Sequence, residues 1–292
     1  MKLIYDSKVY LIGESALDEN VLDEFVHDHG FDEYESHGFS SLEDIVETAG
    51  RLCYMSFKGG RPHKEYIENI LESGHGSVLE HSSISFIITG ISRSLSHELV
   101  RHRAGWAYSQ LSQRYVDESA AEYVVPPAME GAVRMWVNLL DMSDARKSDR
   151  PRSLEEYAAE IGGDNGVELL HAGRNWWEGV AHAHQSYVDA SNYLYAKFAD
   201  EDRTMRRKRA REAARSLLPN ATETKVFATA NLRAIRHFIE LRGSRHADAE
   251  IRKLAYHIFL KARALAPNVF ADYSVNLLED GTKEIITTYR KV

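Results

Sequence analysis

The chain has 292 residues, of which 43% are hydrophobic and 27% are charged, and its formal net charge is −8. These proportions are typical of a folded globular protein, and the negative charge argues against a general nucleic-acid coat protein. Cys53 is the single cysteine, which excludes an internal disulfide and any zinc site built from several cysteines. We find neither a signal-peptide pattern nor a membrane-spanning stretch, and we expect a cytoplasmic protein.

The first half of the sequence alternates between strand and helix patterns. β-Branched and aromatic residues dominate residues 82–90, which predict the clearest strand, and residues 1–14 predict a further strand or hairpin. Apolar residues recur at helical spacing in three other stretches. These stretches predict helices over residues 41–52, 64–73 and 92–102.

The second half is predicted to be mainly helical. A polar stretch over residues 141–166 is typical of a surface loop around a short helix at 154–161, and residues 167–198 carry a long helical pattern. We place this part in a helical insertion over residues 131–202 of one α+β domain that spans residues 1–292. Further predicted elements are an extended piece over 123–127, a strand over 225–229, and helices over 203–217, 232–241 and 247–264.

Several common functional motifs are either missing from this sequence or do not fit its residue spacing. The sequence has no G-x-G-x-x-G turn and no P-loop. His97 and His102 superficially suggest a zinc-protease helix, but they are five residues apart, and a helix turns residues at that spacing about 140° away from each other. We therefore predict no metal site. His182 and His184 also point apart on a helix, and Cys53 has no companion that would make it a nucleophile.

A run of basic residues follows the insertion. Residues 203–215 contain seven arginines and lysines against one acid, Glu212. Such a helix could face phosphates, but a solvated or subunit-facing surface is the favoured interpretation. Arg215, at the end of the run beside two leucines, could point inward.

The most informative stretch is residues 101–115. An Arg-His-Arg triplet at residues 101–103 closes a predicted helix, where cations interact favourably with the helix dipole. A loop follows, and then Ser112 and Arg114. Because the guanidinium group offers a planar fork of donors, this pattern suits phosphates and the carbonyl edges of bases. A helix end paired with acidic neighbours remains the alternative.

This stretch resembles the signature of the flavin-dependent thymidylate synthases, the ThyX family. Four further segments resemble that family and occur in its order, and five matches together are more specific than any one. The resemblance covers roughly residues 40–130 and 203–275. The four segments are residues 74–81, 215–224, 231–238 and 241–247.

The resemblance implies a ThyX-like α+β fold, in which helices flank a central, mostly antiparallel sheet. It also implies a homotetramer with active sites between subunits, and conversion of dUMP to dTMP. FAD would be the cofactor, and NADPH and methylenetetrahydrofolate the co-substrates. Because reduced flavin supplies the hydride and relays the one-carbon unit, no cysteine nucleophile is required.

The resemblance further implies roles for individual residues. Arg242 would be catalytic, since a fixed positive charge at the uracil edge favours the ionised base. The implied substrate-binding residues are Glu98, Arg101, Gln110, Leu111, Ser112, Gln113, Arg114, Arg215 and Arg242. The implied cofactor-binding residues are His75, Ser77, Arg101, His102, Arg103, Gln110, Asn231, Arg233 and His237.

Simpler roles remain open for some residues. His75 could only occupy a turn, and Asn231 could only cap the helix that follows it. Glu80 and His81 could form a buried polar pair. For His246, a core histidine is the favoured interpretation.

The chain departs from the family pattern in one loop. The family places seven residues between the Arg-His-Arg triplet and the serine, whereas this chain has eight, residues 104–111. The extra residue falls within 104–107, where the bulky Trp106 and the flexible Gly105 could reshape the pocket above the flavin. A harmless outward bulge is the alternative. The 131–202 insertion is also longer than the family usually carries, and its aromatic residues are expected to form a local core or a subunit contact.

Three functional hypotheses follow. The first is a flavin-dependent thymidylate synthase. The second keeps the fold and the flavin but transfers the one-carbon unit to a different pyrimidine nucleotide. The third is a nucleotide- or nucleic-acid-binding module without catalysis that uses the basic helix, although nucleic acid is not the expected partner.

Overall fold

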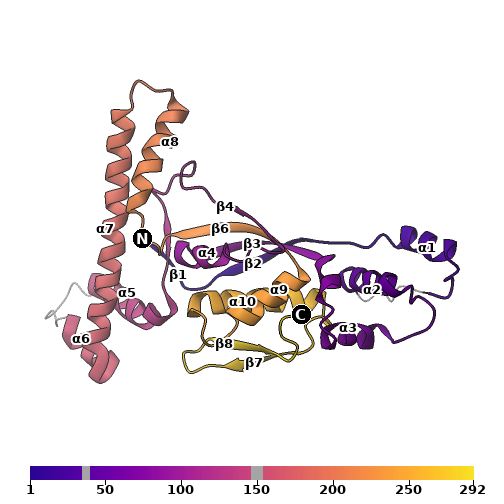
Figure 1. Cartoon of the computed structure of the whole chain (residues 1–292). Coiled ribbons are helices and arrows are strands. Elements are labelled where there is room, and N and C mark those ends of the chain that lie inside the picture. The colour runs from indigo at the N-terminus through magenta and orange to yellow at the C-terminus, as the bar shows by residue number, and fades with distance from the viewer. Residues whose placement is uncertain (35–39, 146–153) are drawn as a thin grey trace. The chain divides into compact units, whose positions relative to one another are not determined.

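A computed structural model describes residues 1–34, 40–145 and 154–292. Internal contacts divide the chain into two compact units, each assembled from segments that are distant in sequence (Figure 1). The single domain predicted from the sequence, with its insertion, stays a prediction. Unit 1 comprises Met1–Asp6, Gly90–Ser96 and Leu111–Thr224, and unit 2 comprises Ser7–Thr89, His97–Gln110 and Lys225–Val292.

In the described chain, unit 2 is built on a four-stranded sheet with the order β2-β3-β6-β4. The pairs β2–β3 and β4–β6 are antiparallel, with Leu11 opposite Phe86 and Tyr108 opposite Ala228. This confirms the predicted α+β class and its antiparallel sheet. A separate antiparallel hairpin is formed by β7 and β8. The strands are β2 (Lys8–Glu14), β3 (Ser83–Ser92), β4 (Trp106–Gln110), β6 (Glu223–Asn231), β7 (Tyr273–Leu277) and β8 (Lys283–Thr287).

Two helices of unit 2, α9 (Leu232–Arg242) and α10 (Ala249–Leu265), lie between the four-stranded sheet and the β7–β8 hairpin (Figure 1). The buried face of α9 carries Ile235, Phe238 and Ile239, which are fully enclosed. Burying a side chain of this size contributes roughly 1.5–3 kcal/mol. The apolar face of α9 therefore fixes the helix that carries several predicted site residues.

The remaining helices of unit 2 lie, in sequence, between strands of the four-stranded sheet. α4 is shorter than the helix predicted over 92–102, because the amides of Arg101 and His102 bond three residues back and form a turn instead. The helices are α1 (Glu19–Asp28), α2 (Ser41–Tyr54), α3 (His63–Glu72), the 3₁₀ turn η1 (Gly76–Glu80) and α4 (Arg93–Leu99), which begins in unit 1.

Unit 1 is mainly helical. The long helix α7 contacts α5, α6 and α8, and Trp136, Leu139 and Leu170 form its core with Ala158. Trp136 thus belongs to a local core, against which Trp177 packs, whereas Tyr193 is exposed, so the predicted role holds for only some of the aromatic residues. The elements are β1 (Lys2–Ile4), β5 (Glu122–Val124), η2 (Pro127–Met129), α5 (Glu130–Ala145), α6 (Leu154–Gly162), η3 (Gly163–Asn165), α7 (Gly166–Lys197), α8 (Arg203–Ala214) and η4 (Arg215–Leu217).

Three expectations about these elements were wrong in detail. Residues 1–14 do not form a hairpin, because β1 pairs in parallel with β5 while β2 pairs with β3. The loop predicted from residue 141 is helical at its start, since α5 continues to Ala145, and residues 146–153 lie outside the described part. The helix predicted over 203–217 becomes a 3₁₀ turn at Arg215. Among the described residues, no helix has both the length and the apolar composition that a membrane span requires.

A buried ionic network joins α2 to α3. His63 bonds to Glu47, and its Nε2 lies 3.1 Å from Glu43 Oε2. Arg51 Nε also donates to Glu47 Oε1, at 2.6 Å. Burial disfavours the charged imidazole, but the hydrogen bonds to the two glutamates outweigh it and raise the pKa of His63 to about 9.

Asp44, Glu47 and His63 also have the spacing of a metal-ligand set, within 4.8 Å of one another. Both ring nitrogens of His63 face carboxylates, however, and a protonated imidazole cannot ligate a metal. In the structure the cluster is an ion network in which both ring nitrogens of His63 face carboxylates.

This network predicts a pH-dependent stability. Because the pKa of His63 is higher in the folded state than its ordinary 6.5, its contribution is complete below about pH 6.5 and is lost as the pH rises through about 9. The contribution should be on the order of 2 kcal/mol at neutral pH. Urea unfolding of the wild type and of His63→Gln should therefore differ at pH 6.5 and converge near pH 10. The matched control is His171→Gln, an exposed histidine. A constant difference across this range would contradict the assignment.

Candidate functional site

The Arg-His-Arg triplet lies in the turn between α4 and β4. The phenol of Tyr108 donates to the carbonyl oxygens of Leu99 and His102, both at 3.0 Å. These hydrogen bonds hold the turn against β4. Arg101 and Arg103 are exposed at this turn, whereas His102 is half-buried. The sequence therefore places two exposed guanidinium groups on either side of a held imidazole.

The extended loop packs inward rather than bulging outward. Gly105 has φ +71°, and a Cβ at this position would lie 2.7 Å from Asn231 Nδ2 and 2.8 Å from Ala234 Cβ. Its carbonyl oxygen accepts a hydrogen bond from Asn231 N at 3.1 Å. The ring of Trp106 stacks on Tyr108 with a centroid distance of 5.6 Å. The loop thus contacts the start of α9, where a predicted cofactor-binding residue lies.

The end of α9 brings together three predicted site residues from different segments. Arg242 Nη1 donates to Glu98 Oε2 at 2.7 Å, and Arg242 Nε donates to His102 Nε2 at 3.0 Å. Burial, with the neighbouring charges of Arg242 and His237, lowers the pKa of His102 to about 4. His102 is therefore neutral at pH 7 and accepts from Arg242, so the guanidinium keeps its charge and is oriented on two sides.

The start of α9 borders a cavity of about 400 Å³. Asn231 caps the helix, because its Oδ1 accepts from Ala234 N at 2.8 Å, and it also lines the cavity. The capping role that the sequence left open is thus present together with the cavity position. Within the described chain, this cavity is lined by Glu80, Ala104, Gly105, Asn231, Arg233, Ala234, His237, Lys291 and Val292.

The predicted cofactor-binding set is only partly gathered here. Asn231, Arg233 and His237 line the cavity in the described chain, while His75 and Ser77 are exposed on or beside η1, which contacts α9. The sequence missed Glu80, which forms an ion pair with Arg233. Glu80 lies in the 74–81 segment with the predicted residues His75 and Ser77, and this position could have indicated that it belongs to the site.

Two simpler roles do not hold. Glu80 and His81 are exposed, so they form no buried pair. His246 is exposed too and lines a different, smaller cavity, so it is not a core histidine. Both predictions were wrong because local helix or turn spacing does not indicate which side chains other segments of the chain will bury.

The other predicted substrate-binding residues lie in unit 1, except Gln110, which ends β4 in unit 2. Arg114 is held by Glu212 of α8, with Nη2 3.0 Å from Oε2, and Gln113 is buried. Arg215 is exposed rather than pointing inward. Leu111 and Ser112 are partly buried in the turn before Arg114.

The basic helix α8 uses much of its charge in local contacts. Arg206 lies over Tyr195 at 3.9 Å from the ring centroid, and Arg209 lies over Phe198 at 4.3 Å. Arg211 Nη2 donates to Asp117 Oδ2 at 2.8 Å. These contacts within the chain remove much of the support for a nucleic-acid-binding helix, while the solvated or subunit-facing surface favoured from the sequence stays a prediction.

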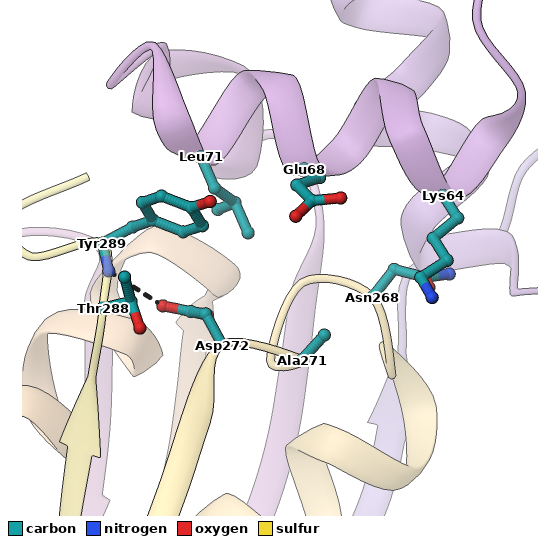
Figure 2. Close-up of a pocket in the computed structure, with 8 residues that line it drawn as sticks. All are labelled: Lys64, Glu68, Leu71, Asn268, Ala271, Asp272, Thr288 and Tyr289. Carbon is teal, nitrogen blue, oxygen red and sulfur yellow. Dashed lines mark hydrogen bonds between the residues drawn. The ribbon is translucent and has the colours of Figure 1, made fainter.

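A second cavity, of about 330 Å³, lies between α3 and the segments that follow α10 and β8 (Figure 2). Two of its polar side chains are engaged elsewhere: Asn268 bonds to Glu43, and Asp272 accepts from Arg236 and from the amide of Tyr289. Burial opposes the ionised carboxyl of Asp272, but its hydrogen bonds with Arg236 outweigh this and lower its pKa. The residues that line this cavity include none of the predicted site residues.

Comparison with known proteins decides the family. A family model described as thymidylate synthase complementing protein matches residues 39–268. The chain is 43% identical over 244 residues to a flavin-dependent thymidylate synthase of Mycolicibacterium gilvum, which covers 82% of each chain. It is 44% identical over 248 residues to one of Mycobacterium sp. (strain JLS), which covers 84% of each.

The chain belongs to the ThyX family of flavin-dependent thymidylate synthases. Membership confirms the predicted family, the enzyme class and the flavin. The fold also matches a crystal structure of a UMP/dUMP methylase, PolB from Streptomyces cacaoi, bound with 5-Br dUMP. That match has a TM-score of 0.59 at 22% identity and covers 93% of this chain and 96% of that chain.

The cavity at the start of α9 suits the flavin of a ThyX protein. A volume of about 400 Å³ is within the range of ligand pockets. The positive end of α9 and the guanidinium of Arg233 border it, and both favour an anionic group. The imidazole of His237 and the amide of Asn231 add groups that can hydrogen-bond to the ligand.

The contact between Arg242 and His102 predicts a measurable coupling. Because the charge of Arg242 lowers the pKa of His102, Arg242→Ala should raise that pKa from about 4 partway to its ordinary range. NMR titration of the histidine rings measures this directly. An unchanged His102 pKa in the variant would show that the two side chains do not interact in solution.

Proposed function

We propose that the protein binds FAD and methylates dUMP to dTMP with methylenetetrahydrofolate as the carbon donor and NADPH as the reductant. One observation carries this proposal: Arg242 forms hydrogen bonds with Glu98 and His102 at the end of α9, and a cavity borders the start of the same helix. Nine residues separate Arg233 from Arg242 on this helix, a rise of about 14 Å at 1.5 Å per residue. In this proposal one short helix contributes residues to both the flavin site and the nucleotide site.

In this proposal Arg242 acts on the pyrimidine. Its guanidinium is held by Glu98 and by the neutral His102, so it loses little conformational freedom when a ligand binds. At the uracil edge it favours the ionised base, because a preorganised cation stabilises negative charge as it develops. The bound flavin supplies hydride transfer and relays the one-carbon unit. No protein nucleophile is required, and the single cysteine, Cys53, lies far along the chain from these residues and is exposed.

The nucleotide phosphate is assigned to Ser112, Arg114 and Arg215. Arg114 would have to exchange its partner Glu212 for the phosphate. Both side chains of this ion pair are more than one-third exposed, so the pair contributes at most about 1 kcal/mol and is readily replaced. Arg101, Gln110, Leu111 and Gln113 remain assigned to the nucleotide, and His75, Ser77, Arg101, His102, Arg103 and Gln110 to the flavin.

The other expectations of this family are part of the same proposal. They are a homotetramer with active sites between subunits, the use of folate, and a cytoplasmic location. Sedimentation of the purified protein tests the first of these, since a monomer at micromolar concentration would contradict it.

The sharpest test of the proposal replaces Arg242. The wild type should bind FAD and form dTMP, whereas Arg242→Ala should still bind FAD but lose about 10²–10³-fold in kcat. The matched control is Arg245→Ala, which removes a nearby exposed arginine that pairs with Glu284. Loss of FAD from Arg242→Ala would overturn its role, and absence of flavin or turnover in the wild type would overturn the function.

The second candidate, a different pyrimidine nucleotide, is favoured by one observation. The eight-residue loop packs on Asn231 through Gly105 rather than bulging outward, so it shapes the predicted ligand site. The fold relative PolB is described as a UMP/dUMP methylase.

Competition between nucleotides decides between these candidates. We expect kcat/KM for dUMP to exceed that for UMP and dCMP, measured with FAD, NADPH and methylenetetrahydrofolate present. A higher kcat/KM for UMP or dCMP would replace the first candidate with the second.

A further inference from the structure

The last two residues of the segment 290–292 form part of the wall of the cavity at the start of α9, although the family model ends at residue 268. Lys291 and Val292 both line that cavity. Neither the motifs of the sequence nor the matched family segment assigns a role to them.

This segment is held in place by residues of unit 2 that lie away from the cavity. Arg236 Nη2 donates to the carbonyl oxygen of Tyr289 at 2.9 Å. Glu240 then accepts from Arg290 Nε at 2.9 Å and from the amide of Lys291 at 3.0 Å. Because Arg236 and Glu240 both belong to α9, these hydrogen bonds hold the segment against that helix.

The backbone at Lys291 turns sharply to reach the cavity. Its φ is +60°, a left-handed value that among the described non-glycine residues only Met55 shares. Such a backbone conformation is unfavourable for a residue with a Cβ and persists only where the surroundings hold it. The turn seats Val292 against Gly76, where a Cβ would lie 2.4 Å from the Val292 carbonyl carbon. Arg233 Nε donates to the carbonyl oxygen of Val292 at 3.3 Å.

The charges around the cavity favour an anion near Lys291. The side chains of Lys291 and Arg233 border the cavity, and the positive end of α9 faces it. Within the described lining, the side chain of Glu80 is the one carboxylate, and it is already paired with Arg233. Lys291 is exposed, so its ammonium can reach a ligand without first being desolvated.

We propose that Lys291 is a cofactor-binding residue that contacts the diphosphate of FAD, and that Glu240 is the positioning residue that holds the 290–292 segment. This inference rests on the proposed function, because it takes the cavity at the start of α9 as the flavin site. It adds a contact from outside the matched family segment.

The test measures the dissociation constants of FAD and of riboflavin by flavin fluorescence on the full chain after removal of flavin. Riboflavin lacks the diphosphate. Lys291→Gly should weaken FAD binding about tenfold, the effect of losing one charge-assisted contact, and should leave riboflavin binding unchanged. Glycine accepts the left-handed backbone, so the turn is kept. Lys291→Arg should bind FAD like the wild type, and Lys261→Ala, an exposed lysine on α10, is the control.

A double-mutant cycle tests the positioning role. Glu240→Ala should also weaken FAD binding, and adding Lys291→Gly should cause no further loss, because both changes remove the same contact. Additive losses would overturn the role of Glu240.

The results separate this inference from the proposed function. If the wild type binds FAD and Lys291→Gly binds it equally well, the inference is wrong while the proposed function stands. Equal weakening of FAD and riboflavin would also overturn it, since the segment would then act only as a wall. A wild type that binds no flavin would overturn both.

Discussion

The position of helix α9 is the constraint on which the rest of unit 2 depends. Its apolar face is fully buried, and Arg236 in its middle forms a buried ion pair with Asp272, with Nη1 2.8 Å from Oδ1. Removing one partner of such a pair would leave a buried charge without compensation, at a cost of about 3–5 kcal/mol. The helix is therefore held rigidly, and the groups at its two ends, Arg233 and Arg242, keep a fixed separation.

The predicted site arginines share an electrostatic arrangement. Arg242 pairs with Glu98, Arg233 with Glu80 and, in unit 1, Arg114 with Glu212. Each pair is partly exposed, so its net contribution to stability is small, although each carboxylate fixes the direction of its guanidinium group. At Arg233 and Arg114, an anionic ligand can thus replace the carboxylate at little cost, whereas Glu98 stays in place to orient Arg242. This differs from Arg236 and Arg51, whose buried pairs are structural.

Sequence reasoning found the parts of this protein that depend on residue type and local spacing. It identified the strand over 82–90, the helices α9 and α10, and the residues that α9 carries at its start and end. It did not find β4, because Trp106-Ala107-Tyr108-Ser109-Gln110 continues a loop that looks irregular. Nor did it find the β7–β8 hairpin. Of the strand or hairpin predicted over residues 1–14, strands form but the hairpin does not, because β1 pairs with residues about 120 positions away, which no local pattern can indicate.

The roles of Glu80 and Lys291 could not be predicted for the same reason. Each depends on which distant segment lies beside it, Arg233 for Glu80 and Glu240 for Lys291. The extra residue before Trp106 was visible in the sequence. Its inward packing became clear only from the contacts of Gly105 with Asn231.

The central claim is that one short helix holds a flavin and a pyrimidine nucleotide next to each other. The visible absorption spectrum of the FAD-bound protein tests it most directly when dUMP is added. A base that lies against the flavin changes its surroundings, so the account predicts a saturable spectral change in the wild type. If calorimetry shows that dUMP binds while the flavin spectrum stays the same, the two ligands do not meet and the account is wrong.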